Sequence, residues 1–202
     1  MAEEFKTIDW RGIRNLVAAE ILTETESEIT YGDPFRVCGV ATLTKTTETS
    51  SAKKYYDNVP AIVIQATGGD EVNVEGSAIQ EHTQAKLMGE FYDEELGMYV
   101  EGEPETKYFA LGYITEDTDG EERYIWRLKG TFSYPESEHT TKDDGTDSTG
   151  STLVYTGVNT LTKFTKTGKT AKAVNVKANK YTAGETKFFE KVQTPDTVGA
   201  SA

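Results

Sequence analysis

The sequence DEVNVEG at residues 70–76 shows the clearest alternation of apolar and polar residues in the chain. Successive side chains of an extended strand point to opposite faces, so the two valines share one face and Glu71, Asn73 and Glu75 share the other. The stretch therefore predicts a strand with one face in a hydrophobic core and one acidic face.

Weaker alternation on both sides of this stretch predicts a protein built largely of strands. The expected strands are Leu16–Leu22, Val37–Leu43, Ala61–Ala66, Tyr108–Thr115, Arg123–Ser133, Leu153–Phe164, Ala173–Val176 and Lys187–Val192. Gly68-Gly69 predicts a turn just before the acidic strand. Asp119-Gly120 predicts the turn of a hairpin, and the pattern of its second strand predicts that one face of this hairpin is polar.

One helix is expected, directly after the acidic strand. Ser77 and Gln80 have the spacing of a capping box, in which each side chain bonds a backbone N–H of the first helical turn. Gly89 lies where a glycine commonly ends a helix in the left-handed conformation. We therefore expect a helix over Ser77–Met88.

Two polar stretches interrupt the expected strands. Residues 44–56 begin with a Thr- and Ser-rich run that has no core pattern, which predicts a long hairpin tip or an ordered arm that serves as a loop between subunits. Residues 139–151 are rich in Asp, Gly, Ser and Thr and predict a mobile loop. The fold class is then mainly β, an antiparallel β-sandwich or rolled sheet with one flanking α-helix, in a single domain over residues 1–193. Residues 194–202 are expected to form a flexible tail.

Charge is distributed unevenly along the chain, whose formal net charge is −13. An acidic protein is unsuited to binding nucleic acid by neutralising phosphates, although an acidic wall would keep DNA from adhering. Residues 159–202 hold eight Lys and three Asp or Glu, a net of +5, so the rest of the chain carries −18. The basic segment, about residues 159–193, has two interpretations: charge balance within the chain, or docking on an acidic face of the next subunit.

The sequence contains no motif for catalysis or metal binding. Cys38 is the only cysteine, and its valine neighbours favour a buried structural thiol. His82 and His139 lie in different elements and lack metal-ligand spacing. Acidic turns such as Asp117-x-Asp119-Gly120 only partly match a calcium loop. We therefore predict no enzyme, no cofactor and no metal.

The sequence also lacks a signal for export or membrane insertion. The N-terminus is acidic and has no apolar run, and no stretch approaches the roughly 20 apolar residues of a membrane span. The expected location is a cytoplasm, from which lysis could release the protein.

Four short motifs resemble those of one family, in the same order. They are Gly12-Ile13-Arg14-Asn15-Leu16-Val17-Ala18-Ala19-Glu20, Tyr56-Asp57-Asn58, Phe109-Ala110-Leu111-Gly112-Tyr113 and Arg123-Tyr124-Ile125-Trp126-Arg127-Leu128-Lys129-Gly130-Thr131-Phe132. Together they resemble the major tail proteins of long-tailed bacteriophages of Gram-positive hosts, over most of residues 5–165. The rest of the chain carries no resemblance.

The resemblance implies a structural virion protein and a set of partners. Such subunits are β-sandwiches flanked by a helix, form hexameric rings, and stack into a hollow tail tube through which DNA is ejected. A long loop reaches a neighbouring subunit. The implied partners are copies of the chain and the tape measure, tail tip and tail terminator proteins. The implied location is the virion tail, with assembly in the host cytoplasm and no membrane contact.

On this hypothesis, particular residues are assigned to the lumen and to contacts between subunits. Glu71, Asn73 and Glu75 are the first candidates for the lumen wall. Further candidates for the lumen or a ring face are Asp117, Asp119, Glu121 and Glu122. The candidate anchors of the arm are Lys53, Lys54, Tyr55 and Tyr56, and tyrosine suits this role because it buries area at low entropic cost.

A second hypothesis is a monomeric β-sandwich that binds carbohydrate or a cell surface. Such a module needs exposed aromatic side chains on one face, and Trp10 and Trp126 are the candidates. Trp126 alternates with charged residues, as a core residue would, so this hypothesis has the weaker basis in the sequence.

Overall fold

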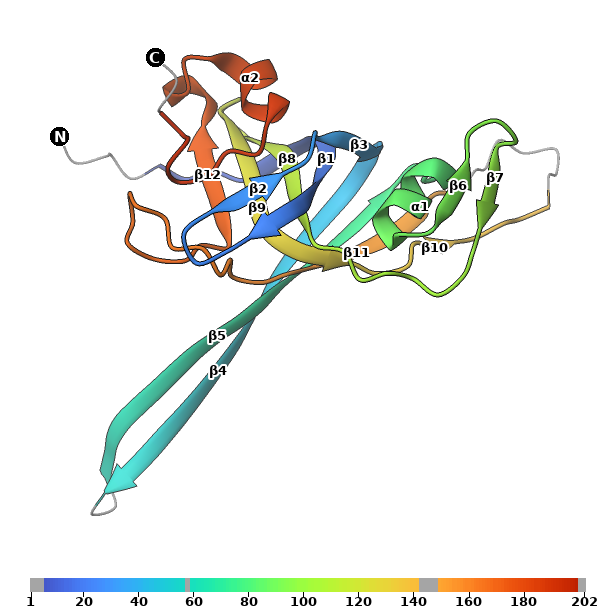
Figure 1. Cartoon of the computed structure of the whole chain (residues 1–202). Helices are drawn as coiled ribbons and strands as arrows, with labels where there is room; N and C mark the ends of the chain where they lie inside the picture. The colour runs from blue at the N-terminus through green and yellow to red at the C-terminus, as the bar shows by residue number, and fades with distance from the viewer. Residues whose placement is uncertain (1–5, 57–58, 142–148, 200–202) are drawn as a thin grey trace.

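The computed structural model describes residues 6–56, 59–141 and 149–199, with the backbone alone for residues 54–56 and 59–66. The protein is mainly β, as predicted, and its described strand pairs are all antiparallel (Figure 1). The strands are β1 (Trp10–Glu24), β2 (Ile29–Tyr31), β3 (Phe35–Cys38), β4 (Val40–Tyr56), β5 (Val59–Gly76), β6 (Phe91–Asp93), β7 (Met98–Val100), β8 (Phe109–Asp117), β9 (Glu122–Phe132), β10 (Glu136–Ser137), β11 (Ser151–Gly157) and β12 (Ala173–Lys177). The helices are α1 (Glu81–Met88), the short 3-10 helix Ala178–Lys180 and α2 (Gly184–Glu190).

One large sheet has the strand order β2-β1-β8-β9-β11-β5-β4. Strand β3 pairs with β1, β10 with β11, and β12 with β9, whereas β6 and β7 form a separate two-stranded sheet. Strand β9 pairs with β8 along one edge, and its other edge is shared between β12 and β11. The sheet is therefore branched at β9, which makes this strand the centre of the body.

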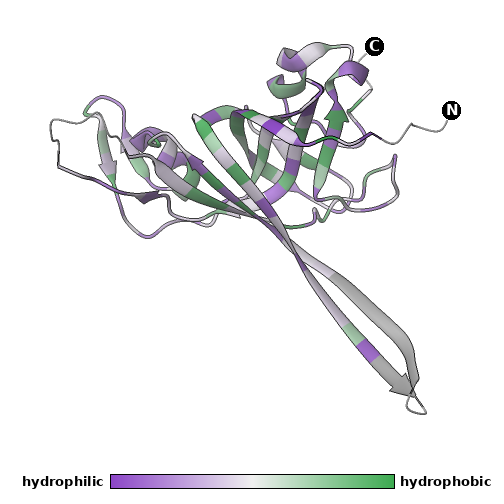
Figure 2. Ribbon diagram, turned by 180° about the vertical axis from the view of Figure 1, so that it is seen from behind, coloured by the Kyte–Doolittle hydropathy of each residue, from purple (hydrophilic) through white to green (hydrophobic). Residues whose placement is uncertain are grey.

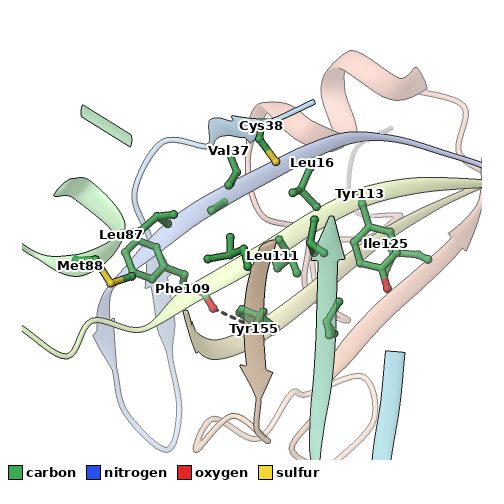
Figure 3. Close-up of a cluster of buried hydrophobic side chains, with 14 residues drawn as sticks. Leu16, Val37, Cys38, Leu87, Met88, Phe109, Leu111, Tyr113, Ile125 and Tyr155 are labelled. Atoms are coloured by element: carbon green, nitrogen blue, oxygen red, sulfur yellow. Dashed lines mark hydrogen bonds between the residues drawn. The ribbon is translucent and has the colours of Figure 1, made fainter. Parts of the chain in front are cut away.

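The body has a hydrophobic cluster on each face of β8 and β9. The inner cluster joins Leu16, Val72, Leu111 and Tyr155 to side chains of β3 and α1, and the Tyr155 hydroxyl donates to the Phe109 carbonyl at 3.0 Å (Figure 3). The two buried valines of the DEVNVEG stretch are part of it, as predicted. The prediction that one face of the β8–β9 hairpin is polar is wrong, because a hydrophobic cluster covers each face.

The outer cluster is covered by the C-terminal part of the chain. Trp126 is fully buried in it, and its indole N–H donates to the Phe188 carbonyl of α2 at 3.2 Å. The strand expected over Lys187–Val192 is instead part of α2 and the segment after it. The aromatic pair Phe188–Phe189 places one ring in the cluster and one beside it, which is how this short helix packs on the sheet.

The expected flexible tail is also ordered as far as residue 199. The Asp196 carboxylate accepts the backbone N–H groups of Thr165 and Lys166 at 2.9 and 2.8 Å, and Thr194 is buried. These contacts fix the chain end against the turn that follows the strand expected over Leu153–Phe164. That strand ends at Gly157, earlier than predicted.

Helix α1 confirms the predicted helix but starts later. It begins at Glu81, and the Ser77 hydroxyl accepts the Gly39 backbone N–H at 3.0 Å instead of capping the helix. The helix ends as predicted at Gly89, whose φ of 69° is left-handed. The contact of Ser77 with Gly39 also marks the break between β3 and β4, which the sequence predicted as one strand.

The longest strands, β4 and β5, form a two-stranded ribbon that leaves the body (Figures 1 and 2). The predicted hairpin arm at residues 44–56 is therefore present, but it is a regular strand and not a loop. The predicted turn at Gly68-Gly69 is wrong, because both glycines lie inside β5 at the point where β11 stops pairing with it. A Cβ on Gly69 would lie 3.0 Å from the Gly157 carbonyl oxygen, so a glycine permits the close approach there.

Candidate assembly surfaces

The arm, defined as the described residues 47–56 and 59–69, is the part of the β4–β5 ribbon that extends away from the body (Figure 1). Beyond Asp70, the only described pairing of β5 is with β4, from Thr49↔Thr67 to Tyr56↔Val59. The eight residues of β4 in this ladder give the arm a length on the order of 25 Å at the rise of a strand. A two-stranded ribbon is marginally stable by itself, so its edges are suited to pairing with another chain.

The base of the arm is fixed by a buried ion pair. Arg127 Nη1 lies 2.6 Å from Asp70 Oδ2, and both side chains are 7 % exposed. Thr47 Oγ1 donates to Asp70 Oδ1 at 2.8 Å, and Arg127 Nε donates to the Tyr113 hydroxyl at 3.3 Å. Lys172 adds a second positive charge 3.5 Å from Asp70. Strands β4, β5, β8 and β9 are thus joined by polar contacts where the arm leaves the body.

The surroundings of Asp70 act on its pKa in opposite directions. Burial would raise the pKa, but the hydrogen bond from Thr47 and the charges of Arg127 and Lys172 outweigh it, so the pKa falls below the ordinary value of 3.8. The carboxyl is therefore ionised near neutral pH, as the ion pair requires.

An acidic face lies beside the base of the arm, on β5. Glu71 and Glu75 are exposed and Asn73 is half-buried, and the Asn73 amide donates to the Glu71 carboxylate at 2.9 Å. The residues directly opposite them, which share this face, are Thr42, Thr44 and Thr46 on β4 and Thr152, Val154 and Thr156 on β11. The first three lumen candidates are therefore brought together on one polar, negatively charged surface.

Asp117, from the second group of lumen candidates, is turned into the protein. It is 2 % exposed, and its Oδ1 accepts the backbone N–H groups of Asp119 and Glu121 at 3.0 and 2.9 Å. This carboxylate stabilises the β8–β9 turn, so the prediction that it lines a lumen is wrong.

The other three candidates of this turn, Asp119, Glu121 and Glu122, each form an ion pair within the chain. Their partners are Lys6 at 2.7 Å, Lys177 at 3.7 Å and Arg14 at 2.7 Å, in that order. Their charge is thus partly neutralised, and they lie on a different element from the acidic face of β5. The turn is a less favourable lumen wall than β5.

The predicted anchors lie on the outer half of the arm. Lys53 is exposed on β4. Lys54, Tyr55 and Tyr56 continue the same strand, but their side chains lie outside the described residues, so their role as anchors stays a prediction.

Among the described residues, one cavity has a thiol, an imidazole and an amine on its walls. This cavity of about 440 Å³ near the start of β4 is lined in part by Cys38, His82 and Lys86. Burial raises the pKa of the Cys38 thiol, which disfavours the thiolate that a nucleophile needs. The His82 ring bonds the Thr83 hydroxyl at 3.1 Å. The described residues contain no cluster of three or more His, Cys, Asp or Glu side chains that could hold a metal ion. Neither described α-helix has the length and apolarity of a membrane span.

The sequence analysis did not predict the buried ion pair between Asp70 and Arg127. Its signal was present, because Asp70 alternates in phase with the two buried valines and Arg127 in phase with Ile125. Opposite charges at core positions of two strands indicate a buried ion pair.

Comparison with protein-family models and with curated proteins finds no match to the chain.

Proposed function

We propose that this protein is a structural subunit that assembles into rings, and that the rings stack into a hollow tube of the phage tail type. The acidic face of β5 lines the lumen, and the arm reaches a neighbouring copy. The motifs that resemble phage major tail proteins and the arm both support the proposal. The protein acts by assembly and not by catalysis, and DNA passes through the tube without specific binding.

The arm is the observation that carries the proposal. Its ribbon leaves the body and has no described backbone partner besides itself. Ordering a residue costs about 1–2 kcal/mol of backbone entropy, and a two-stranded ribbon has no core to offset that cost. A contact with a second chain supplies the missing burial and closes the free strand edges.

The acidic face suits the wall of a DNA channel. Glu71 and Glu75 lie on one strand without a described ion pair, and threonines surround them. Repeated around a ring, these carboxylates give a dense negative surface that repels the phosphate backbone and keeps DNA from adhering.

Shortening the arm tests the assembly. Replacing residues 50–66 by Asn-Gly joins the paired residues Thr49 and Thr67 through a two-residue hairpin turn and leaves the body intact. We expect a folded monomer by light scattering and no rings or tubes by negative-stain microscopy. The matched control, Thr49→Ser with Thr67→Ser, keeps the full arm and should assemble. Tubes of the shortened variant at the wild-type concentration would contradict the role of the arm.

Reversing charge on β5 tests the lumen. Glu71→Lys with Glu75→Lys should still give tubes, but these tubes should retain DNA in a strongly salt-dependent manner, because lysines neutralise phosphates. Glu26→Lys with Glu28→Lys makes the same charge change at exposed positions of the β1–β2 turn and serves as the control. Equal DNA retention by both variants would remove the lumen assignment.

The alternative, a monomeric binding module, has less support. Trp126 is buried in the outer cluster, and the Trp10 ring, although 63 % exposed, has the Arg123 guanidinium 5.5 Å from its centre. A protein that stays monomeric at high concentration, with tail-tip components added, would favour this alternative.

A further inference from the structure

The small sheet of β6 and β7 carries an exposed apolar patch. Its members are Phe91, Leu96, Met98 and Val100, which are 59, 74, 43 and 45 % exposed. Phe91 and Val100 are directly opposite each other, and Met98 lies two residues before Val100 on β7, so these three side chains share one face of the hairpin. Large apolar side chains grouped on one surface indicate a contact with another molecule.

The opposite face of this hairpin is held against the body. The Tyr99 hydroxyl donates to the Glu90 carboxylate, which also accepts the Tyr134 hydroxyl and the Gly102 backbone N–H. The Tyr92 ring lies 6.1 Å from the His82 ring of α1. The apolar patch is therefore presented on a fixed platform.

The rim of the patch is strongly negative. Residues 90–105 contain seven acidic residues and no basic one. Glu94 and Glu95 in the β6–β7 turn are exposed, as is Glu101 directly after β7. A partner that covers the patch must therefore combine apolar side chains with positive charge.

The segment of residues 158–172 has that combination. It contains four lysines and no acidic residue. Leu161 and Val158 are 52 and 37 % exposed, and Lys163 and Lys169 are exposed beside them in sequence. Phe164 anchors the segment in the outer cluster.

This basic segment and the apolar patch lie at opposite ends of the body. Figures 1 and 2 place the β6–β7 sheet at one end and the segment that leads to β12 at the other. One copy cannot bring its own two surfaces together, whereas two copies placed head to tail can. A contact between different surfaces of identical copies repeats, and it closes into a ring when the rotation between copies allows it.

We propose that the apolar patch on β6–β7 docks on the basic segment, residues 158–172, of the next copy, and that this contact joins neighbours within the ring. The inference rests on the proposed function, because it names the lateral contact of the same assembly. The apolar side chains supply the buried area, and the opposite charges set the orientation and speed the encounter.

Charge reversal with complementation tests this contact. Glu94→Lys with Glu95→Lys reverses the charge in the β6–β7 turn, and Lys163→Glu with Lys169→Glu reverses the charge beside Leu161. Each variant therefore opposes like charges at these positions of the proposed contact. Each double variant alone should need at least about tenfold more protein to assemble, because like charges then face each other. An equimolar mixture of the two should assemble like the wild type, because alternating copies restore every opposite-charge contact in a ring with an even number of subunits.

Controls separate this inference from the proposal on which it rests. Lys180→Glu with Lys191→Glu changes the net charge by the same amount as Lys163→Glu with Lys169→Glu, but at exposed positions near α2. This control should assemble normally. If the wild type forms no ring or tube, the proposed function itself fails. If the wild type and both reversed variants assemble equally well, or the mixture does not recover, the contact is wrong while the tube proposal stands.

Cross-linking gives a second readout that does not depend on charge. Leu96→Cys with Leu161→Cys, treated with a short bismaleimide, should give a ladder of covalent oligomers, because each copy carries one half of each contact. Leu96→Cys with Thr186→Cys, which places the second thiol on exposed α2, should give no ladder. A ladder from the control alone would overturn the assignment.

Discussion

Replacing Asp70 by alanine should lower the free energy of unfolding by about 3–5 kcal/mol, because it leaves the Arg127 guanidinium buried without its counter-charge. The two side chains are 7 % exposed and 2.6 Å apart, so water can replace little of the lost interaction. The Thr47 hydroxyl loses its acceptor at the same time. The effect should therefore exceed that of any surface ion pair in this protein.

Urea denaturation followed by tryptophan fluorescence measures this loss, since Trp126 is buried on the same strand as Arg127. The pair Asp70→Leu with Arg127→Met should regain most of the stability, because apolar replacements often equal a buried ion pair. Glu190→Ala removes the partner of Lys187 in an exposed pair and should cost far less than Asp70→Ala, because water and salt screen exposed charges.

The acid limb of the stability curve offers an independent check on Asp70. Its pKa is lowered in the folded state, so its contribution is fully present above the unfolded value of about 3.9 and is lost as the pH falls through the lower folded value. Asp70→Asn should flatten the fall in stability below about pH 4. A loss for Asp70→Ala no larger than that for Glu190→Ala, with an unchanged acid limb, would refute the reasoning.

Two further substitutions probe packing and the platform of the apolar patch. Gly130→Ala should cost about 1–3 kcal/mol, because a Cβ there would lie 2.4 Å from Tyr155 Cζ, and an unchanged melting temperature would contradict this close contact. Glu90→Gln should speed amide exchange in β6 and β7, because the carboxylate accepts the hydroxyls of Tyr99 and Tyr134, and exchange at the wild-type rate would show that these bonds do not hold the hairpin.

Local patterns in the sequence predicted the elements whose signals are themselves local. The alternation at residues 70–76, the Asp119-Gly120 turn and the glycine that ends α1 are each decided by neighbouring residues, and the structure confirms them. The predicted mobile loop falls largely on residues 142–148, which lie outside the described residues.

Predictions failed where distant parts of the chain decide the structure. Gly68-Gly69 resembles a turn, but the end of β11, nearly ninety residues later, makes it the exit of the arm. Lys187–Val192 has an apolar content that suits a strand, yet Phe188 is buried in the outer cluster, and the segment forms a helix over that cluster instead. The prediction of a polar face on β9 failed for the same reason, because the C-terminal part of the chain covers that face.

The candidate site could be predicted only in part, because some of its contacts are not visible in a local pattern of residues. The acidic face of β5 follows from alternation alone, whereas the burial of Asp117 depends on backbone groups of its own turn that a pattern of charges does not reveal. Pairing Asp70 with Arg127 requires knowing that β5 and β9 lie on either side of β11.

The cover over the outer cluster has a consequence for synthesis. Trp126 and Leu128 are made long before Phe188 and Val192, the residues that bury them. Until the ribosome has released residue 192, a nascent subunit presents an open apolar surface on its central strand, a state prone to aggregation and attractive to chaperones. A prematurely terminated chain would keep that surface open and would be removed before it could be built into a larger structure.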